Sequence, residues 1–456
     1  MTLNPKIFKA YDIRGLAPGE LDEDTAYRVG QAFVKFTKAK TVVTGKDMRE
    51  STPGLFEAFA QGVMSRGSDV VDVGLVTTPM FYFAVGDYDL HDGGAMVTAS
   101  HNPKQYNGFK LCHGDVQPIG ADSGMNDVRD LAAAAPYPEQ PAGTTVETDI
   151  REDYLEKLFS LVDTRKFKKL NVVVDTANGM EGIIIKDVFK RLPKCLWHGL
   201  FLDVDGSFPN HEANPLKTET LKDLQEQVRR RKADVGVAFD GDADRVGLVD
   251  ETGEPVRGDI LLALLAPRLL KKAPGAAVIY DVRCSMTVAE EVERAGGVPL
   301  MWKVGHGLIK PKMRETGAVF AGELSQHYYF CDLHNAENTD LVMLMVFELL
   351  SETGRKLSEL VAPLMRYHHS GEINSEVENK EEVLAKLEEV YGHEASTVTR
   401  IDGIRLDFRN ETAPDEDWWF NVRPSNTEPL LRLNLEAKSK EKMEAKRDEL
   451  LKIIRA

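Results

Sequence analysis

The sequence predicts an α/β protein in which three similar α/β domains are followed by an α+β domain. Short apolar runs alternate with longer amphipathic runs up to about residue 367, the pattern of parallel strands joined by crossover helices. Two of the apolar runs, residues 170–175 and 235–240, are almost continuous, as strands buried on both faces are. The alternation begins afresh twice along the chain, which indicates an internal repeat of one α/β unit.

The first domain is predicted at residues 1–146. Residues 41–44 and 70–76 have the composition of strands, and residues 54–66 between them have helical spacing. Residues 132–145 are rich in alanine and proline, so we interpret them as a surface connection to the next domain.

The second and third domains are predicted at residues 147–248 and 249–367. In the second domain, helices and strands are expected at residues 153–161, 170–175, 221–231 and 235–240. In the third domain, they are expected at residues 260–271, 277–280, 287–295, 318–321 and 341–353.

The last domain is predicted at residues 368–456 and has a different rhythm. Its strands and helices are expected at residues 373–377, 384–391, 403–408, 418–423 and 430–437, and a final helix begins at residue 440. Met443, Leu450 and Ile454 recur with helical spacing in that helix, so one of its faces is expected to pack against a core.

Composition excludes several classes of partner. The 456 residues carry a formal net charge of −16, whereas nucleic acid or an anionic membrane needs a concentrated basic face. The N-terminal segment lacks the apolar core of a signal peptide, and the most apolar helical run, residues 260–270, is too short to span a bilayer. The four cysteines show no zinc spacing. We therefore expect a cytoplasmic protein with no nucleic-acid or membrane partner. A monomer or a homodimer is expected, and the sequence does not distinguish between them.

Residues 240–245, D-G-D-A-D-R, place three carboxylates at alternating positions directly after an apolar strand. Asp240, Asp242 and Asp244 offer the hard oxygen ligands that suit Mg²⁺ rather than zinc. A solvated acidic turn is the alternative, but carboxylates gathered at the end of a buried strand are unfavourable without a cation. An EF-hand is excluded because Arg245 stands where that loop needs glycine, and because the flanks are strand-like.

Residues 97–111, V-T-A-S-H-N-P-K-Q-Y-N-G-F-K-L, are predicted to form a loop that leaves a buried strand. Reactive side chains belong on such loops, because the strand positions them and the loop exposes them. No G-x-S-x-G elbow is present, so an α/β-hydrolase nucleophile is excluded. Ser100 and His101 are neighbours whose side chains are expected to diverge. From this segment alone, Ser100 is either a phosphate carrier or an ordinary turn serine.

Two later loops carry candidate binding residues. Residues 423–429, R-P-S-N-T-E-P, with Arg432 beyond them, offer donors that can hold a phosphate dianion, although such residues also make ordinary turns. Residues 322–327, G-E-L-S-Q-H, place a carboxylate and a hydroxyl two residues apart, a pair that can bind neighbouring sugar hydroxyls. Shorter candidate segments are Y-D-I-R-G at 11–15, D-V-R at 281–283 and K-V-G-H at 303–306.

Taken together, these motifs resemble the signature loops of the α-D-phosphohexomutase family. T-A-S-H-N-P with Y-N-G-F-K, then D-G-D-A-D-R, G-E-L-S-Q-H and R-P-S-N-T-E-P, occur in the family's order and spacing across the whole chain. Within the family, the chain looks most like phosphomannomutase/phosphoglucomutase. The resemblance implies three α/β domains and a mobile C-terminal domain arranged around one central cleft.

The resemblance also implies roles for individual residues. Ser100 would be the phosphoserine and would share Mg²⁺ with Asp240, Asp242 and Asp244. The catalytic residues would be Ser100, Arg14, His101, Lys110 and His327, with Lys110 as a candidate general base. Glu323 and Ser325 would bind sugar hydroxyls near the sugar-specificity residue His306. The non-reacting phosphate would be held by Arg423, Ser425, Asn426 and Thr427, and the remaining substrate-binding residues would be Tyr11, Arg245, Arg283, Gly305 and Arg432.

The implied reaction interconverts hexose 6-phosphate and hexose 1-phosphate, with mannose or glucose as the sugar, through a hexose 1,6-bisphosphate. Phosphoglucosamine mutase is the alternative within the family. A Mg²⁺-dependent sugar phosphatase and a non-enzymatic sugar-phosphate sensor are the alternatives outside it. The sequence departs from the family pattern at two places, so the residues at one edge of the site are not assigned. Gln326 stands where relatives usually have glycine, and residues 328–340 differ from the common form.

Overall fold

The computed structural model describes residues 3–88, 90–410, 412–425 and 430–456. The chain divides into two compact units. The first unit consists of residues 1–257, 306–320 and 325–359, and the second consists of residues 258–305, 321–324 and 360–456. Among the described residues, no helix combines the length and the apolar character needed to cross a bilayer.

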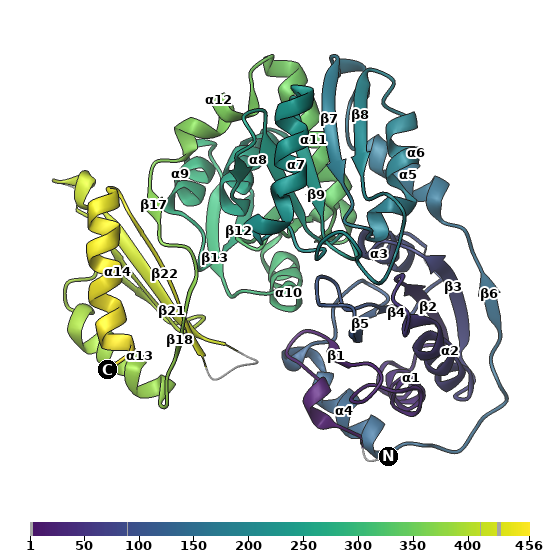
Figure 1. The fold of residues 1–456 in the computed structure, drawn as a ribbon. Helices are drawn as coiled ribbons and strands as arrows, with labels where there is room; N and C mark the ends of the chain where they lie inside the picture. Colours follow the sequence, from purple (N-terminus) through teal and green to yellow (C-terminus); the bar gives the residue numbers. More distant parts are fainter. Residues whose placement is uncertain (1–2, 89, 411, 426–429) are drawn as a thin grey trace. The chain divides into compact units, whose positions relative to one another are not determined.

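The first unit begins with a six-stranded sheet (Figure 1). Neighbouring strands in the sheet are β1 (Ile13–Leu16), β5 (Tyr106–His113), β4 (Gly93–Val97), β2 (Thr41–Lys46), β3 (Asp69–Leu75) and β6 (Thr145–Glu147). β2 runs parallel to β3 and β4, whereas β5 runs antiparallel to both β4 and β1. β6 pairs with β3, so the segment interpreted as a connection ends as an edge strand of the sheet.

Helices cover both faces of this sheet. Alternate residues of a strand point to opposite faces, so each strand contributes side chains to both. Val42, Ala95 and Val97 belong to one apolar core with residues of α1 (Glu23–Thr37), α2 (Thr52–Met64) and α4 (Met125–Ala134). Gly45 and Gly94 lie on the other face, where a Cβ would meet Phe81 of α3 (Thr78–Gly86). Burial on both faces holds the end of β4 rigidly, and that strand end carries the candidate serine.

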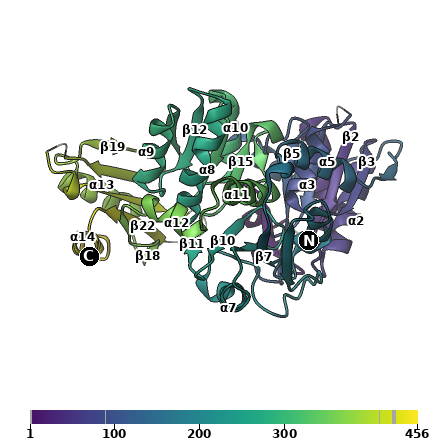
Figure 2. The ribbon, with the colours of Figure 1, turned by 90° about the horizontal axis from the view of Figure 1, so that it is seen from above.

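A second sheet in the first unit carries the acidic loop. Its strands lie in the order β11 (Pro255–Val256), β10 (Val246–Asp250), β9 (Val235–Phe239), β7 (Leu170–Asp175) and β8 (Cys195–Leu200). β7 is parallel to β8 and β9, and β9 and β10 form an antiparallel hairpin. Helix α7 (Lys222–Arg231) packs against this sheet, beside β7 in Figure 2. Further α-helices and strands of the unit are α5 (Arg151–Ser160), α6 (Ile185–Lys190), α10 (His306–Thr316), β15 (Tyr328–Phe330), β16 (Ala336–Glu337) and α11 (Thr339–Thr353), and α12 (Leu357–Val361) begins in it.

The second unit holds parallel strands β12 (Ala277–Asp281) and β13 (Val298–Trp302) with helices α8 (Gly258–Lys272) and α9 (Met286–Arg294). Its C-terminal part is antiparallel, with β17 (His368–His369), β22 (Leu430–Ala437), β21 (Trp418–Pro424), β20 (Ile404–Phe408) and β19 (Thr397–Thr399) in that order, and β18 (Ile373–Glu376) also pairs with β22. α13 (Lys380–Tyr391) and α14 (Lys440–Ile454) pack against this sheet. Met443, Leu450 and Ile454 lie in that core, as their spacing predicted.

A buried acidic pair lies deep in the first unit. Glu181 and Asp340 are both fully buried, and the hydroxyl of Tyr154 donates to Asp340 Oδ2 at 2.6 Å. Burial, and then the charge of Asp340, raise the pKa of Glu181 well above its ordinary value of 4.5. Glu181 therefore keeps its proton in the folded protein at pH values where the unfolded chain has lost it.

Glu181→Gln is expected to make stability less sensitive to pH. A carboxyl whose pKa is raised on folding stabilises the folded state most below its unfolded pKa, and that contribution falls as pH rises above about 4.5 by up to about 1.4 kcal/mol per pH unit. Glutamine cannot ionise, so the Tm of the variant minus the Tm of the wild type should increase from pH 5 to pH 8. Thermal melts at several pH values measure this difference, and parallel profiles would contradict it.

Candidate active site

Ser100 lies just beyond the end of β4 and is almost completely buried. Its backbone N–H donates to Thr98 Oγ1 at 2.9 Å, and its φ of 51° is in the left-handed region, which non-glycine residues adopt at a cost. Such strain persists only where surrounding contacts impose it. The loop between β4 and β5 is therefore a rigid turn that presents the serine hydroxyl.

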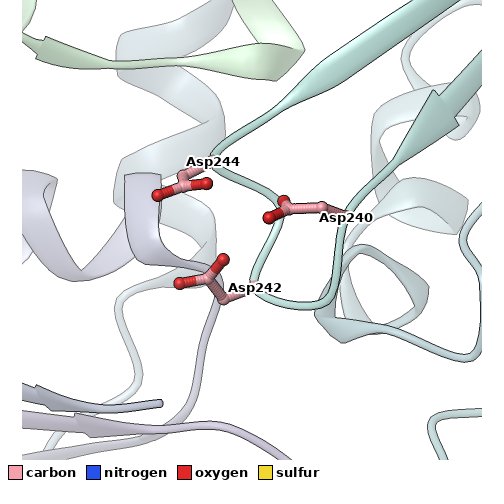
Figure 3. A group of neighbouring side chains, drawn as sticks. All are labelled: Asp240, Asp242 and Asp244. Carbon is pink, nitrogen blue, oxygen red and sulfur yellow. The ribbon is translucent and has the colours of Figure 1, made fainter. Parts of the chain in front are cut away.

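The three aspartates lie on the tight turn between β9 and β10, and all three are buried. Their carboxylates turn toward one another (Figure 3), with one oxygen of each within 4.8 Å of the others. The hydroxyl of Ser100 donates to Asp240 Oδ2 at 2.8 Å. Tertiary structure thus joins two loops that are 140 residues apart in the sequence.

Lys110 balances part of this negative charge. It lies on β5, inside the segment expected to be a loop, because β5 begins at Tyr106. Its Nζ is 2.7 Å from Asp242 Oδ2 and 2.5 Å from Asp244 Oδ2. Burial alone would lower the pKa of Lys110, but the two carboxylates outweigh burial and raise the pKa above its ordinary value. In this arrangement Lys110 is a cation.

The acidic cluster fits a divalent cation. Three carboxylates lie close together and two of them pair with the ammonium group of Lys110, and Asp242 Oδ1 is buried without a hydrogen-bond partner among the residues that the structure describes. Burial, and then the neighbouring carboxylates, raise the pKa of Asp240 well above its usual range, whereas the charges of Lys110 and His327 outweigh burial and lower the pKa of Asp244. Hard oxygen donors and uncompensated negative charge are what Mg²⁺ favours.

Basic and imidazole side chains surround the serine. His101 Nδ1 is 3.2 Å from Ser100 Oγ, so the expectation that these neighbouring side chains diverge is wrong; the left-handed turn at Ser100 brings them together. Burial, and then the charges of Arg245 and Arg14, lower the pKa of His101 well below 6.5. Arg14 Nη1 donates to Asn102 Oδ1 at 2.7 Å in the same loop.

His327 connects the acidic loop to a second histidine. Its Nε2 is 3.3 Å from Asp244 Oδ1 and accepts a hydrogen bond from Arg245 Nε at 3.3 Å. Its Nδ1 lies 3.3 Å from the hydroxyl of Ser325. The ring centroids of His327 and His306 are 6.5 Å apart, and His306 also packs against the ring of Tyr11 at 5.8 Å.

The backbone at Gln326 adopts a conformation that favours glycine. Its φ is 68°, a left-handed value that glycine adopts without strain. The side chain of Gln326 lies beside Gly247 of β10, and the backbone carbonyl of Gln326 accepts from the backbone N–H of Val246 at 3.2 Å. The glutamine is therefore accommodated against β10 by a strained turn.

The second unit holds the remaining candidate residues. Glu323 Oε2 accepts from the backbone of Gly305 at 2.9 Å and lies 3.8 Å from Arg283, whose guanidinium also pairs with Asp281. Glu323 is fully buried, so these contacts orient its carboxylate.

Three arginines of the second unit gather around Glu372. Arg432 Nη1 donates to Glu372 Oε1 at 2.9 Å, Arg423 Nη2 donates to Oε2 at 3.3 Å, and Arg283 lies 3.7 Å away. Burial raises the pKa of Glu372, but the arginines outweigh burial and lower it. Ser425 is close to Arg432, with 3.4 Å between Oγ and Nη2, whereas Asn426 and Thr427 lie outside the described residues. This cluster offers guanidinium forks to an anion.

Sequence reasoning missed several of these contacts. The hydroxyl of Thr78 donates to Asp242 Oδ2 at 2.7 Å, and Glu372 organises the arginines. The guanidinium group of Arg49 donates to the backbone carbonyl of Ser100. Local spacing cannot reveal such partners, because each lies far along the chain from the motif that it supports.

The described site residues fall into two sets. Ser100, His101, Lys110, Asp240, Asp242, Asp244, Arg245, Tyr11, Arg14, His306, Ser325 and His327 lie in the first unit, and Arg283, Gly305, Glu323, Arg423, Ser425 and Arg432 lie in the second.

Gly241→Ala is expected to lower activity by separating the two loops. A Cβ at Gly241 would lie 2.4 Å from the backbone oxygen of Ser100, and a backbone atom cannot move away cheaply. A displacement of about 1 Å lowers kcat by up to about 100-fold. Steady-state assays should show this loss. The matched control is Gly54→Ala, whose Cβ meets only the end of the Glu23 side chain, and equal activity in the two variants would contradict the prediction.

Comparison with known proteins finds matches along nearly the whole chain. Four models of the phosphoglucomutase/phosphomannomutase family match in order: α/β/α domains I, II and III at residues 5–135, 152–253 and 257–367, and the C-terminal domain at 372–453. A phosphomannomutase of Salmonella montevideo is 39% identical, over 99% of each chain. Phosphohexose mutases of Xanthomonas campestris are 41% identical, over 94% of this chain and 95% of theirs. A solved family member from Burkholderia thailandensis is 34% identical and superposes with a TM-score of 0.89, over 99% of this chain and 97% of that one.

The fold and the matched family define an enzyme of phosphoryl transfer on sugars. The chain belongs to the phosphoglucomutase/phosphomannomutase family of α-D-phosphohexomutases. It is a phosphohexomutase, an isomerase that moves a phosphoryl group within a phosphosugar substrate. The predicted fold class, three α/β domains followed by a different C-terminal domain, is confirmed.

Proposed function

We propose that this enzyme interconverts hexose 6-phosphate and hexose 1-phosphate through a phosphoserine at Ser100 and a hexose 1,6-bisphosphate intermediate. The observation that carries the proposal is the 2.8 Å contact between Ser100 Oγ and Asp240 inside a buried triad of aspartates. A serine hydroxyl among three carboxylates is a poor place for a phosphate unless a cation is bound with it. We propose Mg²⁺ as that cation, held by Asp240, Asp242, Asp244 and the phosphoserine, where it would neutralise phosphoryl charge.

Transfer from Ser100 breaks the bond between Oγ and phosphorus and forms a bond between phosphorus and a sugar hydroxyl oxygen. The hydroxyl gives up its proton and Ser100 Oγ regains one. His101 Nδ1, 3.2 Å from Oγ, is placed to exchange a proton at that atom. Lys110 and Arg245 supply positive charge beside the transferring group. Reversal of the same step from the other phosphate of the bisphosphate restores the phosphoserine.

The phosphate that is not reacting needs its own binding site. The cluster of Arg423, Arg432 and Arg283 supports this role because its guanidinium groups already hold a carboxylate, Glu372. We propose that Ser425, Asn426 and Thr427 complete the phosphate site.

Sugar hydroxyls need both donors and acceptors. Glu323 and Ser325 supply them, and we propose that both orientations of the bisphosphate use these two residues. His306 and Tyr11 pack together, and we assign them to sugar selection.

Mannose and glucose are the proposed sugars, because the relatives at about 40% identity are named phosphomannomutases and the matching family models are those of phosphoglucomutase/phosphomannomutase. Glucosamine is the alternative. We further propose domain boundaries at residues 1–146, 147–248, 249–367 and 368–456, and a monomer or homodimer that acts in the cytoplasm.

The test supplies mannose 1-phosphate, glucose 1-phosphate or glucosamine 1-phosphate with a trace of hexose 1,6-bisphosphate, and follows the reaction by ³¹P NMR with Mg²⁺ or with EDTA. The expected result is conversion of the mannose or glucose compound to the 6-phosphate, dependent on Mg²⁺, with almost no inorganic phosphate. Fastest turnover of the glucosamine compound would select the alternative. Release of inorganic phosphate in step with substrate loss would overturn the proposal in favour of a phosphatase.

A further inference from the structure

Arg49 lies in the turn between β2 and α2 and is 1% exposed. All five N–H groups of its guanidinium are engaged. Nε donates to Asp47 Oδ2 at 3.1 Å, and the other four groups donate to backbone carbonyls of the loop that carries Ser100. Those carbonyls, at 2.7, 2.8, 2.9 and 3.0 Å, belong to Ser100, Asn102, Pro103 and Tyr106.

Arg49 is itself held in place. Asp47 Oδ1 accepts from the backbone N–H of Arg49 at 3.1 Å and from the hydroxyl of Thr52 at 2.7 Å, and the backbone N–H of Asp47 donates to Val97 at the end of β4. The ring of Phe208 lies 5.3 Å from the guanidinium carbon. The arginine is therefore braced from β2, from β4 and from an aromatic ring.

Four carbonyls directed at one cation determine the path of the loop. Ser100 has a left-handed φ of 51°, and its own carbonyl is the closest of the four to Arg49. The same carbonyl lies against Gly241, where a Cβ would be 2.4 Å from it, and the hydroxyl of Ser100 donates to the neighbouring Asp240, so holding this carbonyl also holds the hydroxyl against the acidic loop. Among the described residues, the hydrogen bonds of the Arg49 side chain go to Asp47 and to these four carbonyls, so its direct mechanical hold on the serine is through the backbone.

We propose that Arg49 is a positioning residue for phosphoryl transfer, which clamps the loop so that Ser100 Oγ stays in line with the aspartate cluster. The assignment rests on the proposed role of Ser100 as a phosphate carrier. It predicts that loosening the clamp slows transfer, and that the misplaced phosphoserine loses more of its phosphate to water.

Arg49→Lys tests whether the loop needs the shape of the arginine side chain or only its positive charge. Lysine keeps the positive charge but offers three donors from one point, whereas the arginine fork spans four separate carbonyls. Arg49→Lys is expected to lower kcat about 10- to 100-fold, because loss of alignment by about 1 Å has such effects. KM for the sugar phosphate should stay within about twofold if the arginines of the second unit bind the non-reacting phosphate.

The experiment measures kcat, KM, Tm and the ratio of inorganic phosphate to 6-phosphate product for wild type and Arg49→Lys, with phosphorylation at Ser100 followed by intact mass. Val29→Ala is the matched control. It creates a cavity on α1, in the apolar core that also contains Val97 at the end of β4, so it should lower Tm and leave kcat and the product ratio unchanged. Asp47→Asn keeps the arginine but weakens its support, and it serves as the deciding variant if Arg49→Lys does not fold.

A lower kcat, an unchanged KM and a higher share of inorganic phosphate in Arg49→Lys or Asp47→Asn would support the assignment. Wild-type kcat and product ratio in the folded variant, with only Tm reduced, would overturn it and leave Arg49 with a purely structural role. A wild-type enzyme that carries no phosphate and turns over no sugar phosphate would instead overturn the proposed function, and with it this assignment.

Discussion

Ser100→Ala is expected to lower kcat for mutase turnover by about 10³-fold or more, even when hexose 1,6-bisphosphate is supplied. Alanine has no oxygen to carry the phosphoryl group, and the remaining groups can bind substrate but cannot exchange phosphate with it. Removal of a nucleophile leaves only the rate enhancement that comes from binding and charge stabilisation. Tm should change little, because the loop is held by backbone contacts to Arg49 that alanine keeps.

Three measurements check this prediction: kcat by a coupled assay, intact mass with and without bisphosphate, and Tm. Wild type should gain the mass of one phosphoryl group and Ser100→Ala should not. Ser160→Ala, at the exposed end of α5, is the matched control and should behave like the wild type. Full mutase activity in Ser100→Ala would sink the phosphoserine mechanism.

Asp242→Asn should produce the second large effect. Asp242 belongs to the buried cluster: its Oδ2 accepts from Lys110 and from Thr78, and its Oδ1 is buried without a hydrogen-bond partner among the described residues. Asparagine keeps the shape but removes an anionic oxygen ligand, so the affinity for Mg²⁺ and kcat should each fall about 100-fold or more.

Titration of activity with Mg²⁺, together with calorimetry of Mg²⁺ binding, measures both losses. Asp122→Asn makes the same chemical change at an exposed position and should leave the titration unchanged. EDTA should abolish wild-type activity, and added Mg²⁺ should restore it. An Asp242→Asn enzyme with the wild-type Mg²⁺ dependence would show that this cluster is not the functional metal site.

The helices and strands predicted from sequence are those in which the order of apolar and polar residues reflects which faces of the element are buried. β7 and β9 are continuous apolar runs because both faces of their sheet are buried, and the pattern survives without knowledge of the partner strands. Helix α3 escaped prediction because almost every residue of it is buried, so it has no polar face and no helical periodicity. The start of β5 escaped because Tyr106 to Lys110 mix polar and apolar residues at a site that uses both.

The sequence by itself determined the chemistry of this protein, because the groups that act together within one loop are neighbours along the chain. Three aspartates within five positions, directly after an apolar run that indicates a buried strand, predict a site for a hard cation. Only the tertiary structure decided which loop meets which. It placed Ser100 against Asp240, Lys110 between two carboxylates and Arg49 under the serine loop. These contacts join segments about 50 to 140 residues apart, and packing rather than local pattern sets their geometry.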